Sequence, residues 1–223
     1  MNRKEYYSRK NVAKEYDSIR FRTSGGKYVD NQECSIINLF DLNNKEILDI
    51  PCGTGRLSWH ILKKYPNAKI TCADYSREML KITKNKIDNR AVFKRIDLFK
   101  LATKKKFDFV LSLRFFFHYK ELNLMFSQFN KLLKPRGILI FDTLNWSPHQ
   151  LSKNFKSYVF SENDIVTNAK NNDFSLLSKS NMFILPSRVY TYLPKFFISL
   201  LIRLEHIWPD KLMTKSVWVF EKN

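Results

Sequence analysis

The stretch that most constrains the fold is residues 46–56, where a short apolar run leads into a turn with two glycines. Ile47, Leu48 and Ile50 form the run, which is typical of a strand buried on both faces of a parallel sheet. Because Pro51 cannot donate a hydrogen bond to a neighbouring strand, we expect the strand to end there. The pattern therefore predicts a buried, parallel β-sheet.

The residues after this strand predict a ligand-binding turn. Gly53 and Gly55 allow the backbone to turn tightly and to approach a ligand closely. Residues 56–65 carry apolar side chains at helical spacing, which predicts a helix with one buried face. A strand end, a glycine turn and a helix start together direct backbone N–H groups at a ligand. The turn lacks the third glycine of the dinucleotide pattern and the Gly-Lys-Ser/Thr of a P-loop.

Residues 48–55, Leu-Asp-Ile-Pro-Cys-Gly-Thr-Gly, resemble motif I of the class I S-adenosylmethionine (SAM)-dependent methyltransferases, Leu-Asp-x-Gly-Cys-Gly-Thr-Gly. The one departure is Pro51, where the family usually has a glycine. The resemblance implies SAM as cofactor, S-adenosylhomocysteine (SAH) as product, and an α/β fold. That fold is a Rossmann-like three-layer sandwich with a seven-stranded, mostly parallel sheet and an antiparallel last strand. The motif's expected cofactor contacts are Asp49, Pro51, Cys52, Gly53, Thr54 and Gly55.

Composition predicts a folded, reduced protein. A chain of 223 residues suits one domain with a substantial core, and 44% hydrophobic content argues against disorder. No run reaches the roughly 20 apolar residues of a membrane span, and the first residues lack the apolar region of a signal peptide. The three cysteines are odd in number and lack metal-type spacing, so we expect a cytoplasmic protein without a metal site.

The charge balance leaves two interpretations open. Lys and Arg number 39 against 21 Asp and Glu, a formal net charge of +18. Such a field attracts polyanions, either nucleic acid or an anionic membrane surface. A lysine-rich composition of the genome would give the same excess on solvated surfaces everywhere, and the positive residues are spread along the chain.

We expect residues 1–45 to form a helical lid or cap in front of a methyltransferase domain at 46–223. The Thr-Ser-Gly-Gly run at 23–26 predicts a flexible turn. Residues 12–21 are similar to a Tyr-Asp…Arg segment that covers the cofactor in many related methyltransferases. This resemblance implies that Tyr16 and Arg20 meet the methionine end of SAM, with the arginine paired to its carboxylate. A helix end anchored at the surface explains the segment equally well.

Two later strands are expected to end in acids. Residues 68–74 end in Asp74, 19 positions after Gly55, which suits an acid that binds the ribose hydroxyls. A helix-capping role is the alternative. Residues 91–97 end in Asp97, which the resemblance places against the adenine amino group, although aspartates often start turns. The residues next to these acids, Tyr75 and Leu98, complete the expected adenosine contacts.

The fourth expected strand, residues 107–114, resembles the Phe-Asp-x-Val strand that ends facing the transferred methyl group. Leu113 is the cofactor contact expected there. The run at 115–119 is similar to the Leu-His-His-Leu segment of small-molecule and quinone methyltransferases. Ligands of open α/β sheets bind beyond the carboxyl strand ends, so the candidate catalytic residues are Arg114, His118 and Tyr119. A general base at His118 suits its near-neutral pKa, and a structural histidine at a helix start is the alternative.

The remaining elements follow the family pattern only in outline. Strands are expected at 137–142, 174–185 and 216–220, and Asp142, Asn145 and Trp146 are placed near the substrate mouth. We expect 185–208 to be a helical lid. Its second part carries a narrow basic stripe opposite a wide apolar face, which predicts packing on the domain. A helix lying on anionic lipid is the alternative.

The sequence favours one function over two others. The absence of an Asp/Asn-Pro-Pro-Tyr/Phe motif argues against amino-group methylation of adenine or glutamine. With no RNA-binding module visible, a small or lipid-linked acceptor is expected, methylated by in-line displacement. An RNA methyltransferase and a non-catalytic SAM-binding protein are the alternatives, and the complete set of motif residues argues against the latter. The acceptor atom and the oligomeric state stay open.

Overall fold

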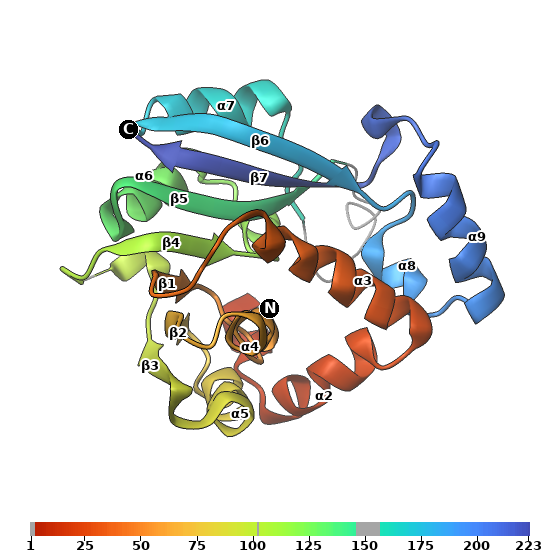
Figure 1. Ribbon diagram of the computed structural model, residues 1–223, viewed down its shortest axis with the longest axis horizontal. Coiled ribbons are helices and arrows are strands. Elements are labelled where there is room, and N and C mark those ends of the chain that lie inside the picture. Colours follow the sequence, from red (N-terminus) through yellow and green to blue (C-terminus); the bar gives the residue numbers. More distant parts are fainter. Residues whose placement is uncertain (1–2, 102, 146–156) are drawn as a thin grey trace.

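A seven-stranded sheet forms the middle of the structure, with helices on both of its faces (Figure 1). The computed structural model describes residues 3–101, 103–145 and 157–223. The strands, in chain order, are β1 (Glu46–Asp49), β2 (Lys69–Asp74), β3 (Ala91–Arg95), β4 (Phe107–Ser112), β5 (Leu133–Leu144), β6 (Phe174–Met182) and β7 (Lys215–Lys222). Their order in the sheet is β3-β2-β1-β4-β5-β7-β6.

The directions of the strands confirm the predicted fold class. Strands β1 to β5 pair in parallel, whereas β7 runs antiparallel to both β5 and β6. The apolar run of β1 is buried on both faces, as expected. Ile47 packs into the core on one face and Leu48 into the core on the other, because successive side chains of a strand point to opposite faces.

The helices divide between the two faces. They are α1 (Arg3–Tyr7), α2 (Lys10–Phe21), α3 (Ser24–Ser35), α4 (Arg56–Lys64), α5 (Arg77–Ile87), α6 (Leu122–Leu132), α7 (Glu162–Lys170), α8 (Ser187–Tyr190) and α9 (Lys195–Glu205). Helices α4 and α5 contribute to the core on one face, and α6 and α7 to the core on the other. Helices α2 and α3 lie beside α8 and α9, at one end of the sheet (Figure 1).

The predicted flexible turn at residues 23–26 is wrong, because these residues begin a helix. The Thr23 side chain caps α3 by accepting a hydrogen bond from the Gly26 N–H at 3.1 Å. The glycines serve close packing. A Cβ on Gly25 would lie 1.9 Å from the carbonyl oxygen of Tyr190, and one on Gly26 would lie 2.4 Å from that of Arg20. Small residues here let α3 contact α2 and α8 directly.

Strand boundaries differ from those expected in two places. The sixth strand ends at Met182 rather than 185, and the next residue, Phe183, has a positive φ of 67°. The fifth strand begins at Leu133 rather than 137 and includes Pro135. Since proline cannot donate to the ladder, it lies where the register with β4 shifts between Phe107 and Phe109.

The apolar face of α9 packs on the domain only in part. Ile198 is buried in a small core with Val29 of α3, and the next turn contributes Leu201. Phe196 and Phe197, in contrast, are 75% and 50% exposed. The helical spacing of apolar residues shows that one face of a helix is apolar, but it does not show what covers that face. Within the described ranges, no helix is both long enough and apolar enough to span a bilayer.

Candidate active site

A cavity of about 680 Å³ opens beyond the carboxyl ends of β1, β2 and β4. Its walls come from these strand ends, from α1 and α2, and from α8. Every predicted cofactor-binding or catalytic residue except Gly55 lines it: His118, Arg114, Tyr119, Asp49, Pro51, Cys52, Gly53, Thr54, Asp74, Tyr75, Asp97, Leu98, Leu113, Tyr16 and Arg20. Of the residues predicted near the substrate mouth, Asp142 and Asn145 do not line the cavity. Trp146 lies outside the described residues. The topology thus gathers residues from five segments of the chain into one site.

The two glycines of the turn have different tasks. Both have positive φ, 54° at Gly53 and 74° at Gly55, a conformation that glycine adopts without strain. A Cβ on Gly53 would meet nothing within 4 Å, so this residue leaves open space at the cavity wall. A Cβ on Gly55 would lie 2.5 Å from the Thr83 side chain of α5. Gly53 therefore borders open space, and Gly55 permits close packing of the turn against α5.

The acids that end β1 and β2 are buried at the cavity wall. Asp49 accepts a hydrogen bond from the Ser58 hydroxyl at 2.6 Å, and burial raises its pKa to about 7. Asp74 accepts hydrogen bonds from the N–H groups of Gly53 at 2.9 Å and Ser76 at 2.8 Å, and burial raises its pKa to about 6. These bonds fix the Asp74 carboxylate to the glycine turn itself.

Asp97 meets a residue that sequence reasoning missed. Lys4 of α1 places its Nζ 2.6 Å from Asp97 Oδ2, and the same ammonium lies 5.1 Å from the ring centroid of Tyr75 and 5.4 Å from that of Phe99. The first helix therefore reaches the acid expected to bind adenine. No motif marks Lys4, because its partner lies 93 positions later.

Helix α2 is tied to the glycine turn. Thr54 donates its hydroxyl to Asp17 Oδ1 at 2.6 Å, and Lys86 of α5 pairs with Asp17 Oδ2 at 2.6 Å. One turn further along α2, the Arg20 guanidinium lies 5.5 Å from the centroid of the Tyr16 ring. Both of these side chains line the cavity. Asp17, the acid of the Tyr-Asp pair, thus anchors the helix that carries them.

Arg114 takes part in a buried ion cluster. Its guanidinium contacts Glu33 at 2.8 and 3.0 Å, and its backbone N–H donates to Asp142 at 2.5 Å. Glu33 is fully buried and also pairs with Arg56 and Lys215, each at 2.6 Å. Burial alone would raise the pKa of Glu33, but the three cations hold it well below its ordinary value. These contacts hold the Arg114 side chain against Glu33 at the cavity wall.

His118 and Tyr119 stand in an aromatic wall. The His118 ring lies 5.9 Å from the Tyr7 ring of α1 and 4.5 Å from the Phe117 ring, between centroids. Tyr119 packs 4.7 Å from Phe99. The wall brings the histidine to the cavity, and its role as a general base stays a prediction.

Comparisons with known proteins find methyltransferases. The profile of the methyltransferase domain family matches residues 48–139. Malonyl-[acyl-carrier protein] O-methyltransferase of Priestia megaterium is 33% identical over 141 residues, which cover 60% of this chain and 48% of that protein. Ubiquinone biosynthesis O-methyltransferase of Pelagibacter ubique is 32% identical over 126 residues, 53% of this chain and 47% of that protein. The chain spans about half the length of these curated relatives.

A solved structure extends the likeness over nearly the whole chain. Magnesium protoporphyrin IX methyltransferase from Synechocystis PCC 6803, crystallised with SAH, superposes with a TM-score of 0.71. The alignment covers 99% of this chain and 97% of that one, at 17% sequence identity. At this identity the likeness concerns the fold. Residues 48–139 thus match the methyltransferase domain family, and the chain as a whole shares its fold with a solved methyltransferase structure.

Proposed function

We propose that the protein is a SAM-dependent methyltransferase that acts on a small or lipid-linked acceptor. The observation that carries the proposal is the cavity itself. It joins an open glycine position, a buried acid held by two backbone N–H groups, and a second acid at the next strand. Relatives named O-methyltransferases and a neighbour that binds SAH support the same cofactor.

The residues fit the cofactor along the length of the cavity. Asp74 would accept the ribose hydroxyls, since each carboxylate oxygen keeps acceptor capacity beyond its one backbone bond. Asp97 would face the adenine amino group, in place of or beside Lys4. Arg20 lines the cavity and, among the described residues, has no carboxylate within ion-pair distance, so it would pair with the methionine carboxylate. Helices α1 and α2 would then act as the lid predicted for residues 1–45.

SAM supplies a methyl group on a sulfonium, which is already a good leaving group. The protein's task is therefore to align the acceptor and to exclude water, and alignment contributes about 7–11 kcal/mol in well-oriented systems. The aromatic wall around Tyr119 and Phe99 provides the dry side of the cavity. His118 would take a proton only if the acceptor atom carries one.

The surroundings of the cavity favour an amphiphilic acceptor over RNA. Helix α8 lines the cavity through Ser187 and Arg188, and α9 follows it directly. Seven large apolar side chains are exposed in this region: Val189, Tyr192, Phe196, Phe197, Leu200, Ile207 and Trp208. Exposed apolar groups suit acyl or isoprenoid chains and do not bind phosphates. The names of the relatives point the same way.

The finer proposal is that α8 and α9 rest on an anionic membrane surface. Lys195 and Arg203 lie on α9 itself, and Arg188 is exposed on α8. Cations beside exposed aromatics are the combination with which interfacial helices bind anionic lipid. A lipid-linked acceptor could then enter the cavity from the bilayer past α8.

We expect a Phe196→Ser/Phe197→Ser variant to bind vesicles containing phosphatidylserine at least about tenfold more weakly than wild type. Full burial of one phenylalanine contributes about 1.5–3 kcal/mol, and about 1.4 kcal/mol is tenfold. Co-sedimentation with vesicles measures the effect. Leu176→Ser/Leu177→Ser, which removes two exposed leucines from β6, is the matched control. Equal binding by all three proteins would exclude α9 as the contact.

Methyl transfer itself is tested with labelled SAM and a cell extract, separated into organic-soluble, RNA and protein fractions. We expect label in the organic-soluble or small-molecule fraction. Label in RNA would show that the +18 charge serves nucleic-acid binding and that the acceptor class is wrong. Binding of SAM without transfer to any fraction would support a non-catalytic protein.

A further inference from the structure

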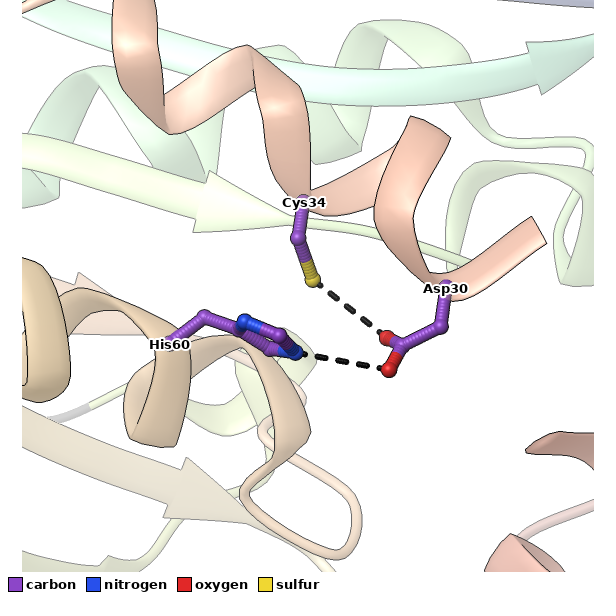
Figure 2. Close-up of side chains that lie close together, drawn as sticks. All are labelled: Asp30, Cys34 and His60. Carbon is purple, nitrogen blue, oxygen red and sulfur yellow. Dashed lines mark hydrogen bonds and ion pairs between the residues drawn. The ribbon is translucent and has the colours of Figure 1, made fainter. Parts of the chain in front are cut away.

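Three metal-ligating side chains meet outside the candidate active site. Asp30 and Cys34 lie one turn apart on the same side of α3, and His60 reaches toward them from α4 (Figure 2). None of the three lines the active-site cavity. Cys34 and His60 instead line a second cavity of about 380 Å³ between these helices.

The donor atoms lie close enough together for small side-chain movements to bring them around one metal ion. Asp30 Oδ1 lies 3.5 Å from Cys34 Sγ, and Asp30 Oδ2 lies 3.3 Å from His60 Nε2. One donor atom from each residue can be chosen so that all lie within 4.8 Å of one another. A tetrahedral zinc ion, with bonds of about 2.0–2.3 Å, keeps its ligand atoms about 3.4–3.6 Å apart.

We propose that Asp30, Cys34 and His60 bind a zinc ion. A thiolate, an imidazole and a carboxylate are the donors that zinc takes in proteins, whereas magnesium and calcium prefer oxygen alone. The second cavity leaves room for water as the fourth ligand. On binding, the Cys34 thiol releases its proton to solvent, and the neutral His60 ring coordinates through Nε2.

Arg56 is a cation that already contacts two of the proposed ligands, so its contacts must be compatible with a bound zinc ion. Its Nη1 donates to Cys34 Sγ at 3.3 Å and to Asp30 Oδ1, and its Nη2 contacts Glu33 at 2.6 Å. These contacts can persist while Asp30 binds zinc through Oδ2. Hydrogen bonds of this kind to coordinating oxygen and sulfur atoms hold metal ligands in place.

The charge of the zinc ion would be balanced by its own ligands. The two positive charges of zinc are matched by the Cys34 thiolate and the Asp30 carboxylate, and Arg56 keeps its buried partner Glu33. The ion would link α3, which belongs to the N-terminal segment, to α4, the first helix after the glycine turn. Because Arg56 also lines the active-site cavity, zinc would stiffen the wall of that cavity from outside.

Cobalt(II) is a suitable probe, because it replaces zinc and absorbs light. Titration of the metal-free full chain should give a thiolate-to-cobalt charge-transfer band and the visible bands of a tetrahedral ion, both lost when zinc is added. Zinc should also raise the melting temperature. Cys34→Ser and His60→Gln should weaken zinc binding by more than the roughly 10–100-fold that loss of an outer hydrogen-bond partner costs.

The controls are Cys72→Ser and His206→Gln, which change a buried cysteine and the histidine that ends α9. Circular dichroism verifies that each variant is folded, and His60→Gln alters a side chain that is one-third exposed. A wild-type protein that gives no charge-transfer band would overturn the proposal. So would Cys34→Ser and His60→Gln variants that bind zinc as tightly as the controls. The outcome does not depend on methyl transfer.

Discussion

Replacing Asp74 by asparagine should weaken SAM binding by on the order of 100-fold. The carboxylate is expected to accept both ribose hydroxyls, and hydrogen bonds to a charged group contribute about 1.5–3 kcal/mol each. The substitution also replaces one of the two oxygens that accept from Gly53 and Ser76, so the glycine turn loses a support. Isothermal titration calorimetry with SAM measures the loss.

The control is Asp210→Asn, which changes an exposed aspartate that does not line the cavity. Its SAM affinity should equal that of wild type. Thermal melting separates loss of binding from loss of fold. If Asp74→Asn bound SAM within about twofold of wild type, the assignment of this cavity to the cofactor would be wrong.

Replacing Glu33 by glutamine should lower the free energy of unfolding by about 3–5 kcal/mol at pH 7. The carboxylate is fully buried among Arg56, Arg114 and Lys215, and its removal leaves buried cations without their charge partner. Urea unfolding measures the change. Glu162→Gln, which alters a 60% exposed side chain, should cost less than about 1 kcal/mol.

The same residue predicts a pH dependence. Since the folded pKa of Glu33 lies below its ordinary value of 4.5, its contribution to stability is complete above that pH and is lost as the pH falls through the folded pKa. Wild type should therefore lose more stability than Glu33→Gln between pH 7 and acid pH. Parallel stability curves for the two proteins would contradict the proposed charge cluster.

Local patterns predicted the parts of the fold that depend on neighbouring residues. The run Ile47–Ile50, the glycine turn and the acid at Asp74 were found because strand burial, turn chemistry and strand ends leave marks within a few positions. The helix start at Ser76 depends on neighbouring residues in the same way, because its hydroxyl accepts from the Met79 N–H at 3.2 Å.

The parts that depend on distant residues could not be predicted. Glu33 meets Lys215 across 182 positions, and neither residue lies in a motif. Asp30 and His60 likewise lie 30 positions apart in the sequence, on two different helices. The spacing of the cysteines therefore gave no sign of the proposed zinc site. At Gly25, the sequence showed a flexible residue, and only the contact with Tyr190 reveals why a side chain is absent.

The pairing of Lys4 with Asp97 ties α1 to the acid that we propose for adenine binding. An adenine amino group that uses Asp97 must share this acid with the lysine or displace it. Cofactor exchange would then include movement of α1, and residues attached ahead of Lys4 would travel with it. An affinity tag fused at that end would accordingly alter the kinetics of the enzyme, whereas a tag after Asn223, next to Asp173 and remote from the cavity lining, would leave them intact.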